Sequence, residues 1–503
     1  MNPISSALAT DTATFRRQRD ACLSMMTALQ ARREEASVGG NEKARKLHQS
    51  RGQMLPRERI TALLDPGSPF LEIGQLTAAD LYEGVPPGAT IITGVGQVCG
   101  RACMLIVNDP TVKGGTMFGM TTKRHVRAQL FAWQHRLPCI TMVQSGGAFL
   151  PDLENIFPDE GQGGSVMYNQ VKMSSEGIAQ IALVFGPSTA GGAYIPALCD
   201  EVVIIRNRGA MFLGSPQLVF AATGEVVDVE PLGGAEMHSR LSGVTDHLAE
   251  DDAHALQITR QIVAHLGEPS RLRWTRAATE APACDPQELP GLVRLGAERD
   301  GEAGVDCREI IARLVDGSRF QEFKQLHGET LVCGFARIEG FEIGILANNG
   351  ELTAQAGAKG AHFIELCCQR DIPLLFLVDS PGFANSDLPD QRGVGKHGAK
   401  LFNAVANADV PKFTLIIGHA YGAACYAMCG RAFKPNALMM WPNARAAASR
   451  DAGDDVAGAL NWARHLWCDM IIEPTETRPV LAQLLDVAGR TPAKPTEFAV
   501  FRM

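Results

Sequence analysis

One long pattern occurs twice in this chain of 503 residues, and it limits the possible folds more than any other feature. The passage from Ile60 to Glu72, with a turn at Asp65-Pro66-Gly67-Ser68, is echoed by Ile311 to Glu322, where the turn is one residue shorter. Downstream positions recur at an offset of 240: Gly94, Gly100 and Asn108 match Gly334, Gly340 and Asn348. Such a repeat predicts two copies of one domain.

Each copy alternates apolar strand-like runs with helical stretches. In the first copy a helix is predicted over 121–135 and a strand over 137–143, and in the second copy a helix over 359–370 and a strand over 372–378. Strands that alternate with helices favour parallel pairing. The expected fold class is therefore α/β, a tandem duplication of one domain.

A chain of this length is too long for one hydrophobic core. We expect a helical leader over 1–40, a first domain over 41–267, a linker over 268–300 and a second domain over 301–503. The linker is predicted from its mixture of charge and prolines, which include Pro269, Pro282, Pro286 and Pro290.

The stretch Ala182 to Pro196 is the first candidate for chemistry. We expect an apolar strand over 182–185, a break at Gly186-Pro187-Ser188, and a buried helix that begins at Ala190. The first N–H groups of a helix have no intrahelical acceptor, and the helix dipole favours anionic oxygen there. Gly191 and Gly192 are therefore candidate donors to an oxyanion, with close helix packing as the alternative role for these glycines.

The second copy has a matching turn at an offset of 232, which places Ala423, Ala424 and Tyr426 on Gly191, Gly192 and Tyr194. Glycine-rich turns also follow the preceding strand of each copy, at 145–148 and at 380–383. In a parallel sheet, such turns gather at the carboxyl edge, where ligands bind. Two donor turns suggest that an anion forms on each of two reactants.

Composition excludes several classes of function. The net charge of −8 argues against a nucleic-acid partner. Thirteen scattered cysteines without a CxxC pair favour a reducing compartment and predict no metal. No strongly apolar run of 18 residues occurs, which predicts no membrane span. The opening lacks a secretory signal, so we expect a cytoplasmic protein, or one of the mitochondrial matrix in a eukaryote.

Long runs of the chain resemble a known family. They include NDPTVKGGTMFGMTTKRHVRAQ, STAGGAYIPALCDE and KGAHFIELCCQRDIPLLFLVD. These runs are similar to the carboxyltransferase (β) subunit of biotin-dependent acyl-CoA carboxylases, and most of all to 3-methylcrotonyl-CoA carboxylase and geranyl-CoA carboxylase. The resemblance covers about residues 38 to 445 and resumes near Asp469.

The resemblance implies two crotonase-like (ClpP/crotonase) domains, with acyl-CoA held by the first and biotin by the second domain of a neighbouring subunit. By position, Gly191 and Gly192 would hold the thioester enolate, and Ala423 and Ala424 the ureido oxygen of biotin. The implied acyl-CoA contacts are Ser145, Gly146, Gly147, Ala148, Lys123, Arg127, Ala190 and Tyr194. The implied biotin contacts are Pro381, Gly382, Phe383, Gly422 and Tyr426.

The family's biotinylated Ala-Met-Lys-Met motif is absent from this sequence. The resemblance therefore implies a partner α subunit that carries biotin carboxylase and biotin carrier domains and consumes ATP and bicarbonate. It also implies a hexamer of β subunits built from dimers. The implied reaction moves a carboxyl group from carboxybiotin to a branched, unsaturated acyl-CoA.

Some positions depart from the family pattern. The turn Asp379-Ser380-Pro381-Gly382-Phe383 is similar to the propionyl type, and the segment after Arg445 is altered and shortened. A geranyl- or propionyl-type substrate, a biotin-independent crotonase-type enzyme and a non-catalytic paralogue therefore remain alternatives.

Several side chains have two interpretations. The basic runs at 43–51 and 123–127, the latter including His125, could contact CoA phosphates or form a solvated face. Tyr194 and Tyr426 are expected to be core residues rather than catalytic ones. Asp379 is expected to cap a turn rather than to act as a base.

Overall fold

The computed structural model describes residues 2–295, 305–384 and 393–500. The chain divides into two compact units. We call Arg32–Ser270 with Arg464–Leu466 the first unit, and Met1–Ala31 with Arg271–Ala463 and Trp467–Met503 the second unit. The expected domain boundaries stay predictions, and residues 296–300 of the predicted linker lie outside the described residues.

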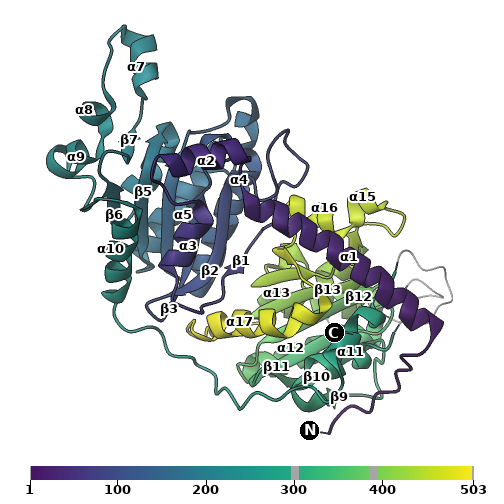
Figure 1. Cartoon of the computed structure of the whole chain (residues 1–503). Coiled ribbons are helices and arrows are strands. Elements are labelled where there is room, and N and C mark those ends of the chain that lie inside the picture. Colours follow the sequence, from purple (N-terminus) through teal and green to yellow (C-terminus); the bar gives the residue numbers. More distant parts are fainter. Residues whose placement is uncertain (1, 296–304, 385–392, 501–503) are drawn as a thin grey trace. The chain divides into compact units, whose positions relative to one another are not determined.

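The first unit is built on one mixed sheet (Figure 1). β2 and β3 form an antiparallel hairpin, and β3, β4, β5, β6 and β8 pair in parallel in that order. The strands are β1 (Leu71–Glu72), β2 (Ile91–Val98), β3 (Arg101–Asn108), β4 (Cys139–Ser145), β5 (Gln180–Thr189), β6 (Glu201–Ile205), β7 (Ala210–Phe212) and β8 (His247–Ala249).

Helices cover both faces of this sheet. Leu63 of α3 and Leu256 of α10 belong to a core with Leu105, Ile140 and Leu183 of the strands. Val126 of α4, Val166 of α5 and Ile195 of α6 pack against Val143 on the other face. The helices are α2 (Glu42–Ser50), α3 (Pro56–Leu63), α4 (Gly119–His135), α5 (Gly163–Ser175), α6 (Tyr194–Ala197), α7 (Pro216–Thr223), α8 (Val229–Gly233), α9 (Ala235–Met237) and α10 (Asp252–Ala264).

The second unit repeats this plan, with the sheet order β16-β14-β13-β12-β11-β10-β9 and β15 paired with β13. The strands are β9 (Gln321–Phe323), β10 (Leu331–Ile338), β11 (Phe341–Asn348), β12 (Leu374–Ser380), β13 (Lys412–Tyr421), β14 (Ala437–Met440), β15 (Arg445–Ala447) and β16 (Met470–Ile471). The helices are α11 (Cys307–Leu314), α12 (Ala354–Gln369), α13 (Val394–Asn407), α14 (Gly422–Ala427), α15 (Asp454–Ala457), α16 (Ala459–Arg464) and α17 (Thr477–Gly489), with α1 (Ala13–Val38) at the start of the chain.

The repeated aspartate turn has the same structural role in both units. The carboxylate of Asp65 accepts hydrogen bonds from the N–H groups of Cys99 and Gly100 in the β2–β3 hairpin. Asp316 accepts the same two bonds from Glu339 and Gly340 in the β10–β11 hairpin. An arginine from the last helix of each unit, Arg260 or Arg478, pairs with the aspartate. The sequence repeat therefore encodes a clamp that joins a turn, a hairpin and a helix.

A second repeated feature is a buried cation on the helix beneath each hairpin. The guanidinium of Arg124 on α4 donates to the carbonyls of Ile73, Gly88 and Ile91 and pairs with Glu72 at 3.1 Å. Its counterpart on α12 is Lys359, which is 1% exposed. Lys359 Nζ has no hydrogen-bond partner among the described residues.

Two expected boundaries were wrong. The strand expected to break at Gly186-Pro187-Ser188 continues to Thr189, because residues 187–189 pair with β7 after β5 has left β6. The helix expected from Ala190 is a 3₁₀ turn, Ala190–Ala193, followed by the short α6. Within the described ranges, none of the helices combines the length and the apolarity that a membrane crossing requires.

Candidate active site

The turn after β5 combines an unusual backbone with two bare glycines. Ala190 has a φ of 52°, in the left-handed region that a residue with a side chain rarely adopts. Ser188 Oγ donates to the carbonyl of Gly192 at 2.8 Å and braces the turn. Strain of this kind persists where the surrounding structure enforces it, and it is concentrated at functional sites.

Space beside the turn is open on the side of Gly191. A Cβ added there would meet only the methyl group of Met167, at 3.9 Å. A Cβ at Gly192 would lie 3.3 Å from Ser188 Oγ, so Gly192 has less free space beside it than Gly191. A ligand can therefore approach the backbone at Gly191 without displacing a side chain.

Gly191 opens into a cavity of about 930 Å³ in the first unit. Six of the predicted acyl-CoA and oxyanion residues line it: Ser145, Gly146, Gly147, Ala148, Ala190 and Gly191. Gly192 is buried in the turn, and Tyr194, Lys123 and Arg127 are not among the lining residues. Lys123 Nζ instead donates to the carbonyl of His465, and the guanidinium of Arg127 lies over the ring of Phe131.

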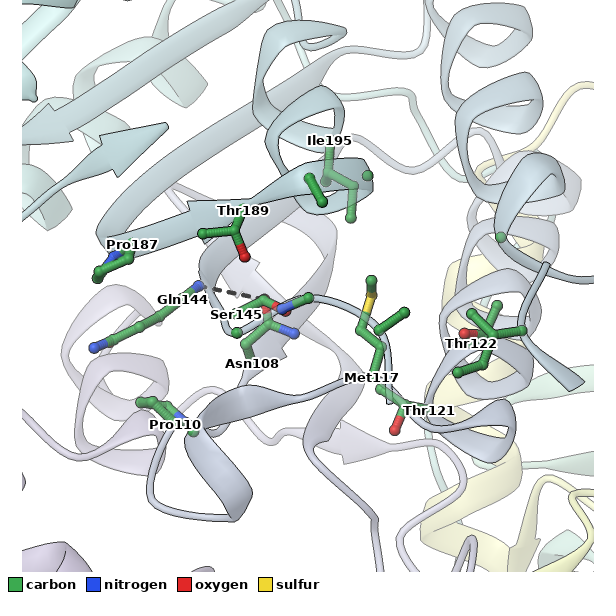
Figure 2. A pocket seen from close by; sticks show the side chains of 18 of the residues that line it. Asn108, Pro110, Met117, Thr121, Thr122, Gln144, Ser145, Pro187, Thr189 and Ile195 are labelled. Carbon is green, nitrogen blue, oxygen red and sulfur yellow. Dashed lines mark hydrogen bonds between the residues drawn. The ribbon is translucent and has the colours of Figure 1, made fainter. Parts of the chain in front are cut away.

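The cavity has two chemically different ends. Figure 2 shows Gln144, Pro110 and Pro187 on one side of Ser145 and Thr189, and Thr121 and Thr122 on the opposite side. The first end includes His48 of the basic helix α2 and Arg51, which directly follows that helix. The opposite end is lined by the start of α4, by Val166 of α5 and by Ile195, and it has no lysine, arginine or carboxylate among its lining residues.

A buried polar network supports the α2 end. Arg59, 1% exposed, pairs with Asp252 at 3.0 Å, donates to Gln144 Oε1 at 3.3 Å and lies 3.5 Å from His48 Nε2. Its guanidinium also stacks on the ring of Phe185, 3.9 Å from the centroid. Burial lowers the pKa of His48, and Arg59 lowers it further. Gln144 and His48 line this end of the cavity, and Arg59 holds both side chains in place.

The solvated face considered for His125 is wrong, and the contact with CoA phosphates stays a prediction. The side chain is 5% exposed and lines the uncharged end of the cavity, because α4 turns this face toward α5 and α6. Burial lowers the pKa of His125 to about 4, so the imidazole is neutral at pH 7. No hydrogen bond to this ring occurs among the described residues.

The core role expected for the two tyrosines is also wrong. Tyr194 is 45% exposed and Tyr426 is 50% exposed. Each begins or lies within a short helix whose other side chains pack on the sheet, so the tyrosine is left on the outer face.

The second unit has a matching turn after β13. Gly422 has a φ of 57°, Ala423 is exposed and Ala424 is buried. The preceding strand ends at Ser380, and Pro381, Gly382 and Phe383 follow it, with Gly382 at a φ of 135°. Aromatic rings are adjacent to one another there: Phe383 and Phe402 at 6.0 Å, Phe402 and Phe433 at 5.7 Å, Phe433 and Tyr426 at 6.5 Å between centroids.

Asp379 and the segment after Arg445 both lie against this second turn. Asp379 Oδ1 accepts from the N–H of His419 at 2.8 Å, and its other oxygen is 3.4 Å from Arg294. Asp379 thus joins β12 to β13 at their register shift, which differs from the expected capping of its own turn. Ala447 pairs with Tyr421, so the altered segment is the counterpart of β7 and of the α7–α9 excursion that projects from the first sheet (Figure 1).

Sequence reasoning missed Arg59 and Gln144. The signal available was the Pro56-Arg57-Glu58-Arg59 run at the start of α3 and the residue that precedes the Ser145 turn. Neither pattern indicates which side chain reaches the cavity, since Asp252 and Gln144 meet Arg59 only in the folded unit.

Comparisons with known proteins agree with this architecture. The carboxyl transferase domain family matches residues 47–453. The biotin-dependent 3-methylcrotonyl-coenzyme A carboxylase beta1 subunit of Mycobacterium tuberculosis is 47% identical, over 93% of this chain and 94% of that protein. The probable mitochondrial methylcrotonoyl-CoA carboxylase beta chain of Drosophila melanogaster is 43% identical, over 100% and 95%.

A solved structure has the same fold. The beta subunit of geranyl-CoA carboxylase from P. aeruginosa superposes with a TM-score of 0.88 at 36% identity, over 99% of both chains. This chain belongs to the carboxyl transferase family, and it is a carboxyltransferase of the acyl-CoA carboxylase type. The expected fold class, two crotonase-like α/β domains in tandem, is confirmed.

Proposed function

We propose that this carboxyltransferase moves a carboxyl group from carboxybiotin to a branched, unsaturated acyl-CoA of the 3-methylcrotonyl type. The observation that carries the proposal is the pair of turns at an offset of 232, each with a left-handed residue before the donor N–H groups. Relatives named for 3-methylcrotonyl-CoA at 43% to 47% identity support the substrate class.

The two ends of the cavity orient the acyl-CoA. Phosphates of CoA would meet the basic helix α2 and Arg51, and the acyl group would extend toward the uncharged end at α4 and α5. This places the thioester beside Gly191, between the two ends. The backbone N–H groups of Gly191 and Gly192 would then stabilise the enolate oxygen, and losing one such donor costs about 3 to 4 kcal/mol in the transition state.

The second turn fits biotin, which supplies the carboxyl group and accepts the proton that leaves the acyl carbon. Its residues combine exposed backbone at Ala423 with an aromatic surface at Phe383 and Tyr426, which suits a small apolar ring that carries one polar oxygen. Ala423 and Ala424 would donate their N–H groups to the ureido oxygen. Pro381, Gly382 and Gly422 would shape the adjoining backbone. Asp379 would keep its structural role between β12 and β13.

The proposed function implies partners that this chain does not contain. Biotin would come from an α subunit with biotin carboxylase and carrier domains, where ATP and bicarbonate are consumed. The chain would form a hexamer of β subunits, in the cytoplasm or, in a eukaryote, in the mitochondrial matrix; a mitochondrial relative supports the second compartment. No metal is needed for enolate chemistry of this kind, and no cluster of three metal-ligating side chains occurs in the described part of the chain.

Geranyl-CoA is the second candidate substrate, because the structure with the TM-score of 0.88 is named for it. The deciding experiment supplies the purified chain with a biotinylated α subunit, ATP and labelled bicarbonate. We expect label to enter 3-methylcrotonyl-CoA faster than geranyl- or propionyl-CoA. No label in any thioester would contradict the proposal, and turnover by the isolated chain without ATP would favour a biotin-independent crotonase-type enzyme.

A further inference from the structure

One polar side chain at the acyl end of the cavity has no partner in the described part of the chain. His125 is 95% buried, lines the cavity and accepts or donates no hydrogen bond there. Its ring nitrogens are not sealed inside the protein, and they open to the cavity. The imidazole is therefore available to a polar group that enters this end of the cavity.

The substrate alone does not supply that group. If the thioester oxygen lies at Gly191, everything beyond it in a branched, unsaturated acyl chain is apolar. Figure 2 shows Thr121 and Thr122 across the cavity from Gln144, and His125 lies one helical turn further along α4. The acyl chain would thus reach the imidazole and leave it unsatisfied.

The reaction creates the missing partner. In the proposed reaction the N–C bond of carboxybiotin would break and release carbon dioxide, the acyl C–H bond would give its proton to the biotin ureido group, and a C–C bond to the new carboxylate would form. We propose that His125 binds this new carboxylate, with one imidazole N–H donating to a carboxylate oxygen. The inference rests on the proposed function above.

The neutral state of the ring suits this role. Burial alone keeps the proton off the second nitrogen at neutral pH, so the imidazole offers one donor and one acceptor. A neutral donor stabilises a forming carboxylate without holding it as tightly as a cation would. Because the bond exists only once the carboxylate has begun to form, it lowers the barrier rather than strengthening substrate binding.

The test compares the affinities of two ligands, 3-methylcrotonyl-CoA and its γ-carboxylated product, for the full chain by titration calorimetry. In His125→Leu we expect the Kd of the product to rise about tenfold, the usual effect of losing one hydrogen bond to a charged group. The Kd of the substrate should change less than about threefold, because it makes no polar contact with the ring. His125→Gln, which keeps a donor, should recover most of the affinity for the product.

His135→Leu is the matched control for His125→Leu, since it is the same substitution at a buried imidazole of the same helix that does not line the cavity. It should lower Tm without changing either affinity. Equal weakening of both ligands in His125→Leu, or an unchanged affinity for the product, would overturn the assignment. A wild-type chain that binds neither thioester would instead contradict the proposed function. If His125→Leu fails to fold, His125→Phe takes its place, since it keeps a planar ring and removes the donor; a loss of affinity confined to the product supports the assignment, and equal affinities for both ligands overturn it.

Discussion

The two donor turns place glycine in opposite positions. In the first turn the left-handed residue, Ala190, has a side chain, and the donors Gly191 and Gly192 have none. In the second turn the left-handed residue is Gly422, and the donors Ala423 and Ala424 each carry a methyl group. Glycine in the second turn meets a backbone requirement, whereas glycine in the first turn leaves room for a ligand. The same backbone geometry therefore serves two sites that differ in how closely a reactant approaches.

The buried cations beneath the hairpins differ in a similar way. Arg124 is surrounded by carbonyl acceptors and Glu72, while Lys359 on the equivalent helix face has a pKa lowered by burial and no hydrogen bond in the described residues. The first unit thus depends on the hydrogen bonds of Arg124, whereas the second unit gains no such bonds from Lys359.

The largest expected effect tests the contrast between Arg124 and Lys359. Arg124→Met should lower the free energy of unfolding of the first unit by about 3 to 5 kcal/mol, because Glu72 and several carbonyls lose their buried partner. Lys359→Met should instead raise the free energy of unfolding of the second unit by about 1 to 3 kcal/mol, because it removes a buried ammonium that has no hydrogen-bond partner in the described residues. Urea unfolding followed by hydrogen exchange in each unit measures both values. Equal losses would refute the contrast.

The next effect separates the two turns. Gly191→Leu fills the open space in front of the turn and should reduce carboxyl transfer at least about a hundredfold while weakening acyl-CoA binding. Ala423→Leu should reduce turnover but leave the acyl-CoA Kd unchanged, because this turn would serve the other reactant. Calorimetry with acyl-CoA distinguishes the two. Loss of acyl-CoA affinity in Ala423→Leu would contradict the division of labour.

Acid should destabilise the first unit more than the second. Burial lowers the pKa of His125 to about 4 and that of His135 to about 3. The unfolded chain takes up these protons below pH 6.5 and the folded unit does not, so stability is full above pH 6.5 and falls as the pH drops toward 4. At pH 5 each imidazole should cost about 2 kcal/mol. Hydrogen exchange at pH 7.5 and pH 5 measures the stability of each unit. His135→Gln should reduce the loss of stability of the first unit at pH 5. An equal loss in both units would contradict the prediction.

The smallest effect concerns the left-handed residues themselves. Gly422→Ala should destabilise the second unit by about 1 kcal/mol, because the added Cβ meets only the carbonyl of Ala448 at 3.6 Å and the cost is conformational. Ala190→Gly should leave stability equal or raise it by less than about 1 kcal/mol. Both variants keep the donor N–H groups and should retain activity. Thermal unfolding and the transfer assay measure the two properties.

The duplication and the two turns could be predicted from the sequence, because a repeat records backbone requirements such as the Asp65 and Asp316 clamps. The pattern at 182–196 misplaced the end of the strand and the start of the helix, since the pairing of residues 187–189 with β7 depends on a strand that begins at Ala210. The exposure of Tyr194 and the burial of His125 were not predictable for a similar reason. Local spacing places a residue on a helix but does not say which neighbouring element covers it.

Both units also share an irregularity next to their sites. The pairing of β4 with β5 shifts register between Val143 and Ser145, and that of β12 with β13 shifts between Val378 and Ser380. A single residue, Gln144 or Asp379, occupies each shift. Because a one-residue change of register reverses the side of a strand on which every later side chain lies, deleting either residue would turn the following glycine loop away from its site. Substitutions can therefore alter the activity of this enzyme, whereas a change of chain length at either of these two positions would abolish it.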